Sequence, residues 1–252
     1  MNEAEVKARH AGSFGVAAEA YERGRPSYPA AALDWLLPPD VVRVLDLGAG
    51  TGKLTRHLAA RGLDVVAVEP SDGMRAELSR CLPDVTAPAG TAESIPLDSA
   101  SVDAVVVAQA WHWVDPSRAV PEVARVLRPG GRLGLLWNCR EEPEGWARDL
   151  GRILRTLGFT EDHSGSPLVG LPFGQVERHD VRWTNPITAE GLVDLVASRS
   201  YFIVQPPAEQ ALVLAQVRRL IAREPGFGNG GRVAMPYVTR CSRATLTPSR
   251  RA

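Results

Sequence analysis

Cysteine is scarce in this chain, and its three cysteines, Cys81, Cys139 and Cys241, lie far apart in the sequence. They form neither a disulfide framework nor a cluster of metal ligands, since both need closely spaced or evenly numbered thiols. This usage is typical of a reducing compartment, and we expect a cytoplasmic protein without a bound metal. A chain of 252 residues buries enough surface to fold without such cross-links.

A net charge is also absent, because 29 lysines and arginines balance 29 aspartates and glutamates. Proteins whose main partner is a nucleic acid usually carry a basic excess, so this balance argues against such a partner. No apolar run approaches the ~18 residues that a membrane-spanning helix needs. The charged N-terminus has no apolar centre of the kind that a signal peptide requires. We therefore expect no nucleic-acid partner and no membrane partner.

The chain does contain a regular series of apolar runs. Strands are expected at residues 41–45, 64–69, 85–89, 102–108 and 132–137, and helices follow most of them. Continuous apolar runs that alternate with helices indicate a parallel sheet covered on both faces. Right-handed crossovers then give a doubly wound α/β fold, in which ligands bind at the carboxyl ends of the strands.

The two ends of the chain differ from this pattern. Residues 14–29 finish in a segment rich in glycine and proline, which is either a lid over a site or a surface wrap. Near the other end, strands are expected at 176–183 and 233–242, paired with each other. Helices at 188–204 and 207–223 form an insertion between these two strands.

The strongest chemical signal is the stretch 44–55, VLDLGAGTGKLT. A buried strand, a tight glycine turn and a helix start let the backbone approach a ligand and offer it free N–H groups. Glu69 ends the next strand, at the distance expected of an acid that binds a ribose. A dinucleotide fingerprint would need a glycine where Lys53 stands. Residues 91–93 and 109–113 also follow strands, so these segments are predicted to meet at one edge of the sheet.

Several of these segments resemble motifs of the class I S-adenosylmethionine-dependent methyltransferases. DLGAGTG at 46–52 resembles their motif I, and VAVEPS at 66–71 resembles their acidic second motif. Residues 90–97 and 102–106 resemble the next two motifs, and LRPGGRL at 127–133 resembles the turn after the following helix. In order and spacing, these motifs cover roughly residues 40–140 and are highly specific together.

The flanking segments resemble a small-molecule subgroup, the methyltransferase type 11 or trans-aconitate-methyltransferase-like proteins. The segments that carry this looser resemblance are 14–29, 109–113, 136–138, 198–201 and 236–239. The resemblance implies a Rossmann-like, mostly parallel, seven-stranded sheet with an antiparallel last strand and a helical insertion over the active site. It also implies one methyltransferase domain over the whole chain, with the following parts: an N-terminal lid and helix at 1–37, a cofactor-binding core at 40–140 and the helical insertion at 188–223.

The resemblance further implies a site for S-adenosyl-L-methionine, with S-adenosyl-L-homocysteine as product. Glu69 would accept hydrogen bonds from both ribose hydroxyls, Asp46 would order the glycine turn, and Arg25 would lie near the cofactor carboxylate. The residues expected to bind the cofactor are Tyr21, Arg25, Asp46, Gly48, Ala49, Gly50, Gly52, Glu69, Pro70, Ser71, Thr91, Ala92, Glu93 and Gln109.

The implied reaction is in-line transfer of a methyl group to a small-molecule O-, N- or C-nucleophile, with a carboxylate among the candidates. His112 is the candidate general base, and its alternative role is packing within Trp-His-Trp. The acceptor is expected between the sheet edge, the N-terminal lid and the late helices. The residues predicted to line it are Trp111, Trp113, Trp137, Arg140, Arg199, Tyr201 and Tyr237.

Two other functions remain open at this point. One is a non-catalytic regulator that binds the same cofactor on the same fold. The other is an NAD-dependent oxidoreductase, against which the spacing of the glycines argues. The protein is expected to be a monomer or a homodimer.

Overall fold

The computed structural model describes residues 24–143, 145–157 and 169–247. The chain divides into two compact units, and β4, β5 and β6 each run from one into the other. The core unit consists of Tyr28–Asn138, His163–Val181 and Thr239–Ala252. The helical unit consists of Met1–Ser27, Cys139–Asp162 and Arg182–Val238. The first part of the predicted lid, with Tyr21, lies outside the described residues.

Four parallel strands begin the sheet: β1 (Arg43–Leu47), β2 (Asp64–Val68), β3 (Val102–Ala108) and β4 (Leu127–Arg140). β1 pairs with β2 on one side and with β3 on the other, and β3 pairs with β4. The order β2-β1-β3-β4 reverses direction at β1, so the carboxyl ends of β1 and β3 flank a switch point.

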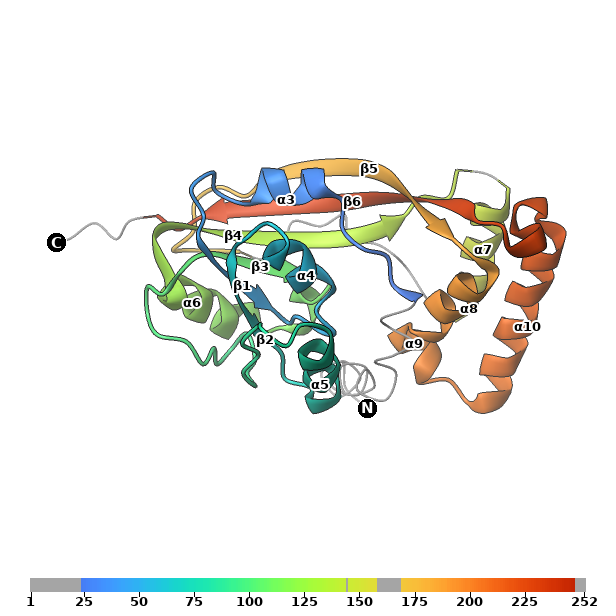
Figure 1. The fold of residues 1–252 in the computed structure, drawn as a ribbon, viewed down its shortest axis with the longest axis horizontal. Helices are drawn as coiled ribbons and strands as arrows, with labels where there is room; N and C mark the ends of the chain where they lie inside the picture. Colours follow the sequence, from blue (N-terminus) through green and yellow to red (C-terminus); the bar gives the residue numbers. More distant parts are fainter. Residues whose placement is uncertain (1–23, 144, 158–168, 248–252) are drawn as a thin grey trace. The chain divides into compact units, whose positions relative to one another are not determined.

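One helix of the core unit, α3 (Ala30–Leu36), precedes β1, and the other helices follow strands (Figure 1). These others are α4 (Lys53–Ala59), α5 (Asp72–Cys81) and α6 (Pro116–Val126), with a short 3-10 helix, η2 (Trp111–Trp113). Side chains just before two of these helices cap them. The Ser71 hydroxyl accepts the Met74 N–H before α5, and the Asp115 carboxylate accepts the Ser117 N–H before α6.

Both faces of the parallel strands are buried. Val44 and Val106 belong to an apolar cluster with side chains of α3 and α4. Leu45 and Val105 are their neighbours along the strands and point to the opposite face, yet they are fully buried as well. This confirms the doubly wound arrangement that the continuous apolar runs predict.

The last strand, β6 (Val233–Thr245), is antiparallel to β4, as predicted. β5 spans Glu177–Ile187, and β6 lies between β4 and β5 in the sheet. The Leu246 N–H donates to the Gly131 oxygen, whereas the Glu141 N–H donates to the Pro236 oxygen. β6 therefore runs in the direction opposite to β4.

The sheet of the described residues has six strands, whereas the sequence predicts seven. The missing strand is the one expected at 85–89. Thr86 forms a single parallel bridge to Val66, and the Glu69 N–H donates to the Pro88 oxygen at 3.4 Å. Because Pro88 has no N–H group, it cannot donate a hydrogen bond to β2. The pairing of this segment with β2 therefore does not extend into a regular strand.

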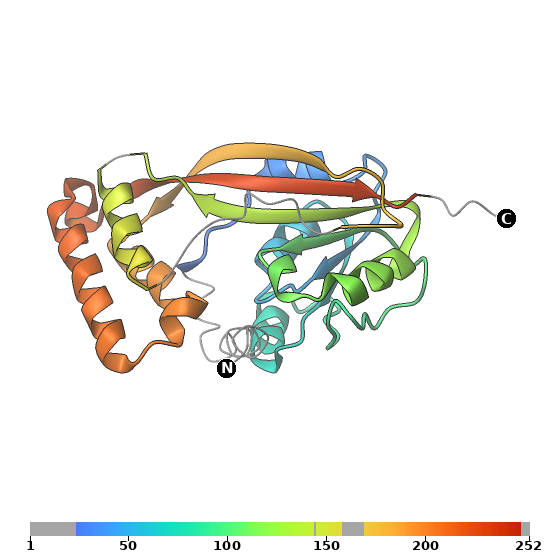
Figure 2. The same ribbon diagram turned by 180° about the vertical axis from the view of Figure 1, so that it is seen from behind.

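The helical unit contains the predicted insertion. Its helices are α7 (Trp146–Arg155), α8 (Ala189–Ala197), α9 (Ser200–Ile203) and α10 (Pro207–Arg223), followed by the 3-10 segment η3 (Pro225–Gly230). α10 packs beside α7 and α8, which Figure 2 shows from behind. Leu150, Leu192 and Val217 lie in their shared apolar cluster.

The prediction of a single helix at 188–204 is wrong, because α8 and α9 are separate helices. The break falls at Ser198 and Arg199. The Ser198 carbonyl oxygen accepts a hydrogen bond from the Arg25 guanidinium at 3.3 Å. A Cβ atom at Gly24 would lie 2.4 Å from the Asp194 carbonyl carbon, so residues 24–25 press against the end of α8. A contact with a segment so distant in sequence is invisible to helical periodicity.

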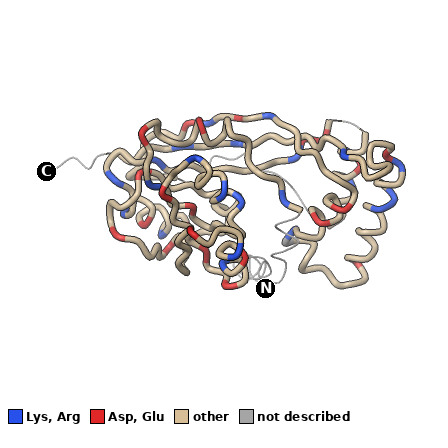
Figure 3. Tube along the Cα trace, in the orientation of Figure 1, with Lys and Arg blue, Asp and Glu red and all other residues tan. Residues whose placement is uncertain are grey.

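Basic and acidic residues are interspersed over the described trace of both units (Figure 3). Among the described helices, none is long and apolar enough to cross a membrane. Within the same ranges, no three histidine, cysteine, aspartate or glutamate side chains gather as a metal site would require.

Candidate functional site

The glycine turn after β1 lies against the ends of the two neighbouring strands. The N–H groups of Gly48 and Ala49 donate to the Val68 oxygen at the end of β2, at 2.8 Å and 3.2 Å. Gly48 has a φ of 72°, and a Cβ atom there would lie 2.9 Å from the Ala110 Cβ, just beyond β3. Only glycine meets both demands, because other residues resist this backbone conformation and would collide with Ala110.

Glu69 joins the ends of β1 and β2. Its side chain is buried; one carboxylate oxygen accepts the Gly50 N–H at 3.0 Å and the other accepts the Ser71 N–H at 2.9 Å. Burial raises the pKa of this carboxyl group, although both backbone hydrogen bonds and Arg75 act in the opposite direction. The predicted ribose-binding acid is thus held against the glycine turn by the backbone.

Asp46 is buried beneath the same turn. Its Oδ2 atom accepts a hydrogen bond from the Thr55 hydroxyl at 2.6 Å, while its Oδ1 atom is buried without a hydrogen-bond partner among the described residues. Burial raises the pKa of Asp46 to about 7, and the negative charge of Glu69 adds to this rise. Thr55, on α4, was not identified from the sequence, although it stands within the glycine-turn stretch.

The loop that follows residues 85–89 packs against the end of β2. A Cβ atom at Gly90 would lie 3.0 Å from a Val68 methyl group. Thr91 and Ser94 exchange backbone hydrogen bonds across a tight turn, and Ala92 is buried. The Glu93 carboxylate accepts the Asp115 N–H at 2.8 Å, so in the structure it holds the segment after η2.

Gln109 directly follows β3 and has an uncommon backbone conformation, with a φ of 58°. Its N–H donates to the Leu136 oxygen, and its side-chain amide donates to the Asn138 oxygen at 3.2 Å. Asn138 in turn accepts a hydrogen bond from the Thr239 hydroxyl at 2.6 Å. This network holds the turn after β3 to β4 and β6.

The contacts above bring the predicted cofactor residues of the core unit together at one edge of the sheet. Pro70 lies among them and is exposed. Gly52, with a φ of 85°, begins α4 directly after the glycine turn. Convergence of these segments is what the switch-point argument predicts. Arg25 belongs instead to the helical unit, where it contacts Ser198.

The Trp-His-Trp segment forms η2 after β3. Trp111 is buried, and its indole Nε1 atom has no hydrogen-bond partner among the described residues. The His112 ring is exposed and lies 4.4 Å from the Trp113 ring, between centroids. Trp137, on β4, is buried in the same unit.

The other four residues predicted to line the acceptor lie in the helical unit. The Arg140 guanidinium is buried and pairs with Glu142 at 3.3 Å. The Arg199 guanidinium lies 5.9 Å from the centre of the Tyr201 ring. Tyr237 is buried, and its ring stacks on a tryptophan of β5, Trp183, at 5.4 Å.

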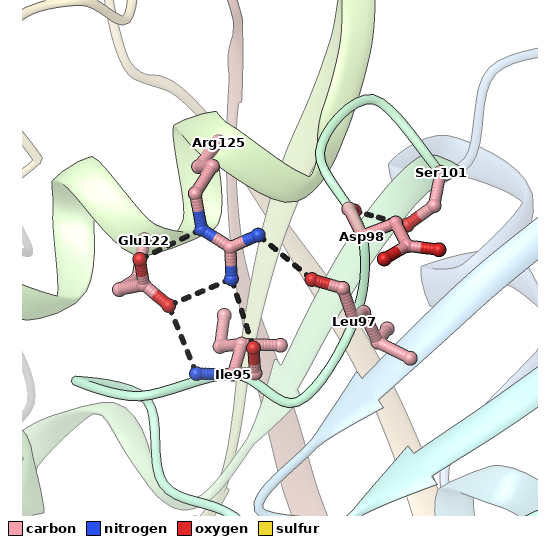
Figure 4. Close-up of polar contacts among 6 residues, drawn as sticks. All are labelled: Ile95, Leu97, Asp98, Ser101, Glu122 and Arg125. Carbon is pink, nitrogen blue, oxygen red and sulfur yellow. Dashed lines mark hydrogen bonds and ion pairs between the residues drawn. The ribbon is translucent and has the colours of Figure 1, made fainter.

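Two more residues, which contact the loop after residues 85–89, escaped the sequence analysis. Glu122 and Arg125, on α6, hydrogen-bond to the backbone of the loop that carries Thr91 to Glu93 (Figure 4). Their spacing of three residues indicates an ion pair on one helix face. Nothing in the sequence indicates that this face turns toward the loop.

Comparison with known proteins agrees with this geometry. A family described as the methyltransferase domain matches residues 45–135. An uncharacterised methyltransferase of Mycobacterium tuberculosis is 59% identical over 235 residues, which cover 93% of this chain and 96% of that protein.

Solved structures share the fold. A putative type II methyltransferase from Anaeromyxobacter dehalogenans has a TM-score of 0.65 at 22% identity, covering 89% of this chain and 99% of that one. A phosphoethanolamine N-methyltransferase of Haemonchus contortus, solved with S-adenosylhomocysteine, has a TM-score of 0.56 at 14% identity, covering 93% of this chain and 58% of that one. By its sequence relatives and its fold, the chain belongs to the class I S-adenosylmethionine-dependent methyltransferases.

Proposed function

We propose that the sheet edge of the core unit binds S-adenosyl-L-methionine and that the protein transfers its methyl group to a small-molecule acceptor. The observation that carries the proposal is the position of Glu69, buried at the end of β2 and hydrogen-bonded to the glycine turn. The S-adenosylhomocysteine bound in the Haemonchus contortus structure supports the same cofactor here.

The residues at this edge suit the cofactor. A Cβ atom at Gly50 would meet nothing within 4 Å, so open space adjoins the backbone of the turn. Beneath the turn, the buried Oδ1 atom of Asp46 lacks a donor among the described residues. An open backbone surface beside two buried carboxylates fits a ligand that carries hydroxyl and ammonium donors.

Each part of the edge then has a distinct task. Glu69 accepts the ribose hydroxyls, and the glycine turn admits the amino-acid portion. Pro70, Ser71 and the loop 91–93 bind the adenine, and Gln109 offers backbone groups near the methionine chain. Tyr21 and Arg25 are still predicted to close over the cofactor, with Arg25 near its carboxylate.

When bound, S-adenosyl-L-methionine supplies an activated methyl group on a sulfonium. The protein therefore has to position the acceptor and exclude water, and these two effects provide most of the catalysis. The acceptor is an O-, N- or C-nucleophile, with a carboxylate among the candidates. Membership of the trans-aconitate-methyltransferase-like subgroup stays part of this proposal.

His112 is the proposed general base for acceptors that hold a proton at neutral pH. We expect His112→Ala to lower methyl transfer roughly a hundredfold or more while leaving S-adenosylhomocysteine affinity unchanged. Transfer is measured from radiolabelled S-adenosylmethionine into a metabolite extract. His179→Ala is the matched control, because the His179 ring also lies against a tryptophan ring, that of Trp35, with 5.3 Å between the ring centres. Equal transfer by both variants would assign His112 to packing.

Calorimetry with S-adenosylhomocysteine and with NAD tests the function itself. We expect the first to bind and the second not to, since the turn lacks the third glycine of a dinucleotide site. Binding of NAD alone would favour the oxidoreductase. Binding of S-adenosylhomocysteine without any transfer into a metabolite extract would favour the regulator.

A further inference from the structure

Helix α6 holds the loop after residues 85–89 through two side chains, Glu122 and Arg125 (Figure 4). The Glu122 carboxylate accepts the Ile95 N–H at 2.9 Å. The Arg125 guanidinium donates to the oxygens of Ile95 at 2.8 Å and Leu97 at 2.7 Å. Both polar groups of the Ile95 backbone are therefore engaged by one helix.

The two side chains also hold each other. Arg125 Nε lies 2.8 Å from one Glu122 oxygen, and one of its terminal nitrogens lies 2.9 Å from the other oxygen. This two-point pairing places the guanidinium plane so that its remaining donors face the loop. Arg125 and the Ile95 hydrogen bond together lower the pKa of Glu122 to about 2, so Glu122 stays charged at neutral pH.

The loop is braced on either side of this contact. Before it, a Cβ atom at Gly90 would lie 2.5 Å from the Pro96 ring, so the loop closes tightly on itself. After it, the Ala100 N–H donates to the Arg125 oxygen at 2.8 Å. The Ile95 side chain is buried as well. The segment from 90 to 100 therefore owes its conformation to contacts with α6 as well as to its own turns.

The Glu122–Arg125 pair contributes more to the stability of the loop conformation than an ordinary surface ion pair would. An exposed pair contributes little, because water competes for both charges. Here the pair also satisfies one N–H and two carbonyl groups of the loop, and its loss would leave them without these partners. The loop that depends on it carries Ala92 and Glu93, which the proposed function places at the adenine.

We propose that Glu122 and Arg125 are positioning residues for the adenine end of the cofactor, since they hold the loop 91–97 in its binding conformation before the cofactor arrives. This inference rests on the proposed function. A preformed loop loses little freedom on binding and offers its backbone groups to the adenine edge in fixed directions. The pair therefore sets both cofactor affinity and selectivity for the base.

The test replaces Arg125 with lysine in the full chain. Lysine keeps the charge but cannot reproduce the planar fork that reaches four acceptors. We expect S-adenosylhomocysteine binding to weaken at least about tenfold, the equivalent of one charge-assisted hydrogen bond. The preference for S-adenosylhomocysteine over S-inosylhomocysteine, in which oxygen replaces the adenine amino group, should shrink. Both affinities are measured by calorimetry.

Arg80→Lys is the matched control. Arg80 pairs with Glu77 three residues earlier through the same two-point geometry, on α5, and its side chain is 70% exposed. We expect this variant to bind both compounds as the wild type does. If Arg125→Lys does not fold, Glu122→Gln serves instead, because glutamine keeps the shape and loses the charge.

Three outcomes contradict the inference. Unchanged affinity and preference in a folded Arg125→Lys variant would remove the positioning role. An equal loss for both compounds would assign the pair to general stability, since unfolding does not distinguish the two bases. A wild-type protein that binds neither compound would overturn the proposed function and this inference with it.

Discussion

Replacing Glu69 with alanine is expected to weaken S-adenosylhomocysteine binding by roughly 1–3 kcal/mol, which is about 5- to 150-fold in Kd. The ribose hydroxyls lose their acceptor. The N–H groups of Gly50 and Ser71 also lose theirs, so the glycine turn is no longer tied to the end of β2. Calorimetry at neutral pH measures the change.

Two companion variants separate this effect from a loss of stability. Glu69→Gln keeps the volume and one acceptor oxygen, so we expect an intermediate affinity. Glu209→Ala makes the same chemical change as Glu69→Ala at an exposed position in the first turn of α10, and its affinity should match the wild type. Wild-type affinity in a folded Glu69→Ala protein would count against the whole cofactor site.

The second large effect is a pH dependence of stability that comes from Asp46. Its pKa is raised to about 7 by burial, while an unfolded chain has a value near 3.8. The folded protein therefore holds this proton more tightly than the unfolded chain does. The contribution of Asp46 to the free energy of unfolding is greatest below pH ~4 and falls as the pH rises toward 7, by on the order of 3 kcal/mol.

Asp46→Asn isolates this contribution. Asparagine has the same shape and can still accept the Thr55 hydroxyl, but it does not titrate. Urea unfolding between pH 4 and pH 7 should show the wild type losing stability relative to the variant as the pH rises. Parallel curves for the two proteins would mean that Asp46 ionises as it would in water.

The proposed cofactor-binding edge could be predicted from the sequence because its signals are local. The apolar run at 102–108 is β3 in the structure, with the same bounds. The glycine turn and Glu69 were predicted to meet, and the Gly50 hydrogen bond joins them. Apolar periodicity and turn chemistry act within a few residues, so a single chain displays them without knowledge of its neighbours.

Other features depend on residues that are distant in sequence. The strand expected at 85–89 does not form, because Pro88 lies where a hydrogen bond to β2 would be needed. At the break between α8 and α9, Arg25 donates a hydrogen bond to the Ser198 oxygen. From the sequence alone, Glu122 and Arg125 are an ordinary ion pair on a helix. Only the structure shows that α6 lies against the loop at 95–97. Local propensity can indicate that a side chain is on a helix face. The tertiary packing decides which backbone groups the helix face contacts. That packing follows from the burial of the sheet as a whole.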